Sequence, residues 1–107
     1  MAKQIADLNW EKRILIISYE NKNNNLFIKI EKFISDYKCE LNDRNLEIIF
    51  FEKFKNINFL TPKFINEKYG IWLLGYDGEI KYYSLDEKIL FRLFNLIDSM
   101  PMRKNEI

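Results

Sequence analysis

The feature that most constrains this chain is a short run of four large apolar residues with a polar residue at each end. Residues 13–18 read Arg-Ile-Leu-Ile-Ile-Ser. The run lacks the apolar and polar alternation of a half-exposed strand, so it predicts a strand that is buried on both faces. We expect it to be the central strand of a sheet.

The residues that follow predict a strand–helix–strand unit. From residue 25, apolar side chains recur at the spacing of an amphipathic helix, with charged residues on the other side: Leu26, Ile30, Phe33, Ile34, Tyr37 and Leu41. A turn cluster at 42–45 then leads into a second apolar run at 46–51, which predicts another strand. A connection of this length between two strands implies a parallel crossover.

The second half of the chain begins with an irregular stretch and ends in a hairpin and a helix. Residues 52–69 have no clear period, and we expect only a helical turn at 63–68. The apolar runs 71–75 and 80–84 flank Asp77-Gly78, a hairpin signal because both residue types tolerate positive φ.

The last helix has a predicted start and a predicted stop. Asp86 is its expected N-cap, and Pro101 ends a broad apolar stripe that runs from Ile89 to Met100. The order is therefore βαβ followed by ββα. We expect an α/β fold with a mixed central sheet flanked by helices, in a single domain over residues 1–107 with its core at about 10–103.

Three segments carry a resemblance to a known family. They are Trp-Glu-Lys-Arg at 10–13, Leu-Gly-Tyr-Asp-Gly-Glu-Ile-Lys at 74–81, and the ending Ile-Asp-Ser-Met-Pro-Met-Arg at 97–103. They resemble the thioredoxin-like domain of unknown function shared by small bacterial proteins and the sushi-repeat-containing and DRO/URB/Equarin matrix proteins, the peroxiredoxin-related "DUDES" family. The resemblance implies a thioredoxin-like fold and a non-catalytic protein-binding module.

The chemistry of thioredoxins and peroxiredoxins is not visible in this sequence. Their reactive Cys follows the first strand, but residues 18–25 contain no Cys, and Gly70 stands where the fold usually has a cis-Pro. Cys39 lies beside Glu40 near the end of the first predicted helix, where the helix dipole disfavours a thiolate. We therefore expect no catalytic residue; residual thiol peroxidase or disulfide reductase activity of Cys39 is the alternative.

Composition excludes several other functions. The chain has no His, so Ser-His-Asp triads and ordinary zinc sites are absent, and its three Gly residues form no phosphate-binding loop. Its net charge is +1 with the two signs interspersed, which argues against nucleic-acid binding. We therefore expect no cofactor and no metal. We also expect no membrane-spanning helix, because no apolar run approaches about 20 residues. An aromatic pocket for a small ligand is a third possibility.

The compartment and the oligomeric state stay open. The first residues do not form a signal peptide, which predicts a cytosolic protein for the sequence as it stands. The resemblance implies the opposite, because family members are often exported or periplasmic.

Two groups of residues are candidates for a functional surface. Asp98 lies in the last turn of a helix, where a carboxylate needs a cation, and Arg103 or Arg13 is the expected partner. With Trp10 packed over Met100 and Pro101, these residues would form either a clasp between the termini or a recognition surface.

The second group lies in the irregular stretch. Phe54, Phe59 and Lys63 place aromatic and cationic side chains together, as protein interfaces do. They form either a surface for another protein or a loop that covers the core.

Overall fold

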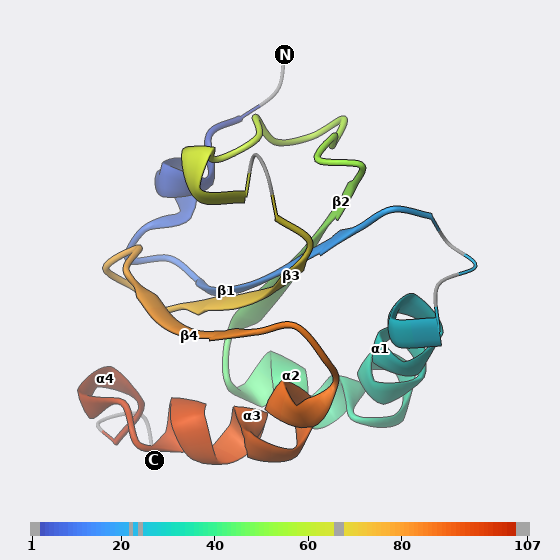
Figure 1. The fold of residues 1–107 in the computed structure, drawn as a ribbon. Helices are drawn as coiled ribbons and strands as arrows, with labels where there is room; N and C mark the ends of the chain where they lie inside the picture. The colour runs from blue at the N-terminus through green and yellow to red at the C-terminus, as the bar shows by residue number, and fades with distance from the viewer. Residues whose placement is uncertain (1–2, 22, 24, 66–67, 105–107) are drawn as a thin grey trace.

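A mixed sheet of four strands, in the order β2-β1-β3-β4, forms the centre of the protein (Figure 1). The computed structural model describes residues 3–21, 23, 25–65 and 68–104. The central strand β1 (Arg13–Tyr19) pairs in parallel with β2 (Leu46–Glu52) and antiparallel with β3 (Gly70–Leu74), and β3 pairs antiparallel with β4 (Ile80–Ser84). The predicted mixed sheet is confirmed, and the architecture is compatible with a thioredoxin-like fold.

The α-helices lie on one side of this sheet in Figure 1, and two short 3₁₀-helices lie on the other. The elements are α1 (Asn25–Asp36), α2 (Lys38–Asp43), α3 (Lys88–Asp98) and α4 (Pro101–Lys104), with η1 (Ile5–Leu8) and η2 (Lys63–Ile65) opposite. The predicted helical turn at 63–68 is present at 63–65, residues 66–67 lie outside the described residues, and Lys68 is not helical.

The alternate side chains of β1 enter two separate cores. Leu15 and Ile17 pack under α1 and α3, whereas Ile14 and Ile16 pack with the residues that η1, η2 and the irregular stretch contribute. All four are at most 1% exposed. The strand is buried on both faces because a layer of chain covers each face, as the sequence predicts.

The predicted first helix is divided in two. Residue Tyr37, with φ −119° and ψ 28°, separates α1 from α2. The change of direction lets Leu41 remain buried in the core while the Tyr37 ring contacts Phe94 of α3, at 5.7 Å between ring centroids. The break at Tyr37 therefore separates α1 from the short helix that leads into β2.

Two local details differ from the sequence prediction. The turn between β3 and β4 is closed by a hydrogen bond from the Gly78 amide to the Gly75 carbonyl (3.0 Å), so positive φ occurs at Gly78 (80°) and not at Asp77. The N-cap of α3 is Glu87 rather than Asp86. Asp86 nevertheless accepts a hydrogen bond from the Lys88 amide (3.0 Å) and so satisfies a donor of the first turn.

Candidate functional site

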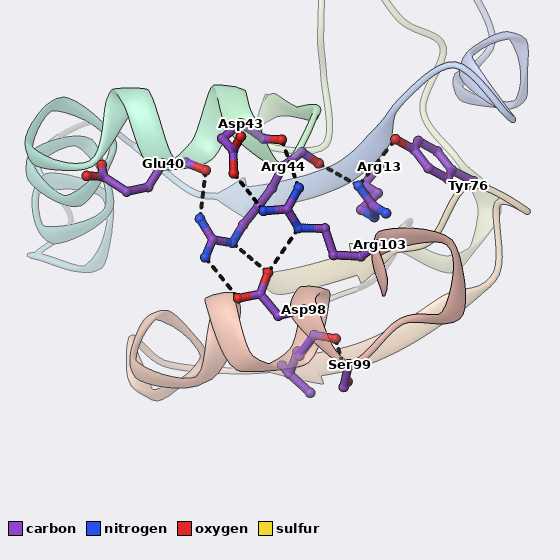
Figure 2. Close-up of polar contacts among 9 residues, drawn as sticks. Arg13, Glu40, Asp43, Arg44, Tyr76, Asp98, Ser99 and Arg103 are labelled. Atoms are coloured by element: carbon purple, nitrogen blue, oxygen red, sulfur yellow. Dashed lines mark hydrogen bonds and ion pairs between the residues drawn. The ribbon is translucent and has the colours of Figure 1, made fainter. Parts of the chain in front are cut away.

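Asp98, the last residue of α3, is held by two arginines (Figure 2). Its Oδ1 accepts hydrogen bonds from Nε of Arg44 (3.0 Å) and Nε of Arg103 (3.2 Å), and its Oδ2 accepts one from Nη2 of Arg44 (2.9 Å). The pair with Arg44 is bidentate, the strongest geometry for a guanidinium and a carboxylate. These bonds, the Arg44 bond first, lower the pKa of Asp98 below its usual value of 3.8.

The same arginines bind the end of α2. Arg103 is buried and donates from Nη2 to Oδ2 of Asp43 (2.6 Å) and from Nη1 to the Asp43 carbonyl (3.2 Å). Arg44 donates from Nη1 to the carbonyl of Glu40 (2.9 Å). We call Asp43, Arg44, Asp98 and Arg103 the arginine–aspartate network. It joins α3 and α4 to the junction of α2 and β2.

Arg13 lies at the start of β1 and is fully buried. Its Nη1 donates to the carbonyl of Arg44 (2.7 Å) and to the hydroxyl of Tyr76 (3.2 Å), and its guanidinium lies 4.2 Å from the centre of the Tyr76 ring. Asn45 also donates to the Tyr76 hydroxyl (3.0 Å). Arg13 therefore joins the sheet to the β3–β4 turn and continues the arginine–aspartate network on its other side (Figure 2).

Trp10 is the exposed member of the predicted group. It has φ 68°, its amide donates to the carbonyl of Tyr76 (2.7 Å), and 68% of its surface is accessible to solvent. It lines a pocket of about 240 Å³ together with Tyr76, Met100 and Pro101, and Lys81 stands at the same pocket. We call this the Trp10 pocket. The sequence places Trp10 over Met100 and Pro101; the structure places these residues around one hollow.

The residues proposed from the irregular stretch have separate environments. Phe54 stacks on Tyr69, with ring centroids 4.7 Å apart and planes 15° apart, and its carbonyl accepts a hydrogen bond from the hydroxyl of Thr61. Phe59 is half-buried against the second core, and Lys63 is exposed on η2. Both Phe side chains thus have contacts within the chain, and Lys63 alone of the three points to solvent.

The structure also shows where the residues considered for redox and metal chemistry lie in the described part of the chain. Ser18 is buried at the end of β1 and pairs across the sheet with Gly70, and Cys39 is exposed on α2. No group of three or more His, Cys, Asp or Glu residues is placed to hold a metal ion among the residues described. Within the same residues, no helix is long and apolar enough to cross a membrane.

Sequence reasoning missed Asp43, Arg44 and Tyr76. Arg44 belongs to the turn cluster at 42–45, which was sufficient to explain it as a loop residue. The information that brings Arg44 close to Arg13 is the register of the sheet, because Arg13 of β1 pairs with Leu46 of β2. Arg44 is two residues before Leu46, so it lies at the same end of these two strands as Arg13. The register, however, could not be deduced without the structure.

Comparison with known proteins identifies one match. A family model described as a domain of unknown function, DUF4174, matches residues 4–106. No curated protein and no solved structure is significantly similar to the chain.

Proposed function

Because this chain belongs to the DUF4174 family of domains of unknown function, its role has to be argued from its own site, and we propose that it is a non-catalytic protein-binding module. The Trp10 pocket is the binding site in this proposal, and its ligand is one apolar side chain of a partner protein. The observation that carries it is the conformation and exposure of Trp10.

Trp10 is exposed at an energetic cost. A residue with a side chain in the left-handed region costs roughly 1 to 2 kcal/mol, and Trp10 has φ 68°. The hydrogen bond from its amide to the carbonyl of Tyr76 holds this conformation. Strain of this kind, at a residue that leaves a large indole in water, is typical of functional positions. Trp is also among the residues most enriched at the energetic centres of protein interfaces.

The walls of the Trp10 pocket are fixed before any ligand binds. Tyr76 is held by Arg13 and Asn45, and Met100 and Pro101 lie between Asp98 and Arg103, which the arginine–aspartate network anchors. A preformed pocket avoids the entropic cost of ordering its walls on binding. Its volume of about 240 Å³ suits a single large side chain rather than a whole cofactor.

We also propose that the family relation extends to the bacterial and matrix proteins of the thioredoxin-like, peroxiredoxin-related "DUDES" group. The resemblance of the ending at 97–103 supports this. Asp98 and Arg103, which its pattern specifies, are the two residues that hold the C-terminal helices in place. The sequence pattern of the ending then specifies one wall of the Trp10 pocket, and this role requires no catalytic residue.

Selection from a random peptide library displayed on phage tests the proposal. We expect peptides that share an apolar anchor, with binding measured by isothermal titration calorimetry. Trp10→Asn removes the indole and keeps a residue that tolerates positive φ, and it should weaken binding by about 30-fold, the loss typical of an interface hot spot. Phe91→Ser is the matched control, since Phe91 is also exposed but lies outside the pocket.

Two results would overturn the proposal. One is a selection that yields no peptide with measurable affinity. The other is a set of selected peptides that bind wild type and Trp10→Asn equally well, because the pocket would then not be the site.

A further inference from the structure

A second hollow lies between α1 and α3, and it shares no lining residue with the Trp10 pocket. Its volume is about 610 Å³, and its apolar lining consists of Phe33, Tyr37, Leu90, Phe91 and Phe94. We call it the α1–α3 groove. The rings of Phe33, Tyr37 and Phe94 contact one another with centroids 4.8 to 5.7 Å apart, and the Arg44 guanidinium lies 4.2 Å from the centre of the Phe94 ring. These packed rings form the floor of the groove.

The rim of the α1–α3 groove exposes aromatic surface. Phe91 is 82% exposed and Tyr37 is 43% exposed. Apolar side chains gathered at a hollow, unlike isolated exposed ones, indicate a surface that another molecule covers. The charges on the rim indicate which molecule.

Two opposite charges stand one helical turn apart on the α1 side of the groove. Lys32 and Asp36 both line it, and within the described residues neither takes part in an ion pair. Lys29 and Glu87, in contrast, pair across one end of the groove at 2.9 Å. A partner with charges of one sign would be attracted to one of Lys32 and Asp36 and repelled by the other. The rim therefore favours a partner that carries the same two charges in the opposite order.

A second copy of the chain carries them in that order. In a two-fold symmetric contact, residue i of one copy meets residue j of the other and the reverse contact follows. If the axis passes beside α1, perpendicular to the helix and level with the midpoint of positions 32 and 36, the two α1 helices lie antiparallel and Lys32 of each copy faces Asp36 of the other. We infer that the chain forms a symmetric dimer through the α1–α3 groove, with Phe91 withdrawn from water in the contact.

The charges supply a direct test by sedimentation equilibrium at protein concentrations from micromolar to millimolar. We expect a reversible dimer, because a contact between two helix pairs is at the small end of stable interfaces. Lys32→Glu and Asp36→Lys each create two repulsive contacts and should each raise the dissociation constant by about tenfold. The double variant Lys32→Glu, Asp36→Lys restores both pairs and should recover the wild-type dissociation constant.

The control is Lys55→Glu, which makes the same charge change at an exposed residue outside the groove and should leave the dissociation constant unchanged. Phe91→Ser should give a monomer. A wild-type protein that stays monomeric at every concentration overturns the inference. So does a double variant that is no better than the single ones. Neither result affects the proposed role of the Trp10 pocket, which is measured by peptide binding.

Discussion

Replacement of Asp98 by Asn tests the arginine–aspartate network most directly. Hydrogen bonds to charged groups contribute about 1.5 to 3 kcal/mol each, so the three that Asp98 accepts would together contribute about 4 to 9 kcal/mol if they were fully buried. The side chain is 35% exposed, however, and water replaces part of this interaction. Removing a negative charge from the last turn of a helix also returns about 0.3 to 1 kcal/mol. We expect a net loss of about 2 to 3 kcal/mol in the free energy of unfolding.

Urea unfolding followed by circular dichroism measures this loss. With a slope of about 1 to 3 kcal/mol per molar urea, a loss of about 2 to 3 kcal/mol should lower the midpoint by about 0.7 to 3 M. The loss itself is a large part of the stability of a small domain. Glu87→Gln is the matched control. It removes an ion pair of similar length, 2.9 Å, but its partner Lys29 is 58% exposed, whereas the partners of Asp98, Arg44 and Arg103, are 14% and 8% exposed. Its midpoint should therefore fall far less than that of Asp98→Asn.

A midpoint for Asp98→Asn within about 0.3 M of wild type would refute the reasoning, because a loss of 2 kcal/mol requires a larger shift. A double-mutant cycle with Arg44→Gln gives a second check. The two residues should couple by more than about 0.5 kcal/mol, since they interact directly. Additive effects would show that the bidentate pair does not stabilise the fold.

Three further predictions follow from single residues. The pKa of Asp98 is lowered in the folded protein, so its stabilising contribution is present above about pH 4 and is lost as the pH falls through the folded-state pKa. Urea unfolding from pH 7 to pH 2 should therefore show a constant stability difference between wild type and Asp98→Asn above about pH 4. The difference should shrink below that pH. Lys53, exposed with φ 50°, is strained, so Lys53→Asn should raise the free energy of unfolding by about 0.5 to 1 kcal/mol; a lower melting temperature in calorimetry would contradict this. Cys39→Ser should consume hydrogen peroxide no more slowly than wild type in a spectrophotometric assay, and a faster wild-type reaction would instead support a thiol peroxidase.

The parts of the fold that the sequence predicts are those with a strong hydrophobic period. The apolar run 14–17 has no polar face to leave in water, which predicts a strand covered on both sides, and the structure buries it in this way. The cover on the second face could not be predicted, because Ile5 and Ile65 reach it from 3₁₀-helices of three or four residues. Elements of this length show no period, and their burial is decided by the tertiary structure.

The candidate site was predictable where the sequence places a charge in an unfavourable position that requires an opposite charge nearby. Asp98 at the end of a helix requires a cation, which is why Arg103 could be expected from the sequence. Arg44 had no such need, since a turn accounts for it, and only the pairing of β1 with β2 brings it to Asp98. The exposure of Trp10 was equally hidden, because an aromatic residue beside an apolar strand is more often buried.

Under the proposed function, stability and recognition depend on different members of one cluster. Asp98 and Arg103 bind each other, and Arg103 binds Asp43 at the end of α2, so these contacts hold the C-terminal helices in place with Met100 and Pro101 between them. Trp10 completes the same pocket, yet it is exposed and strained, so it contributes little to the folded state. A change at Asp98 must therefore alter both properties, because the wall of the pocket moves when its anchor is lost. Under the proposed function, Trp10→Asn weakens recognition while it relieves backbone strain in the fold, and this asymmetry is what separates a binding surface from a structural clasp.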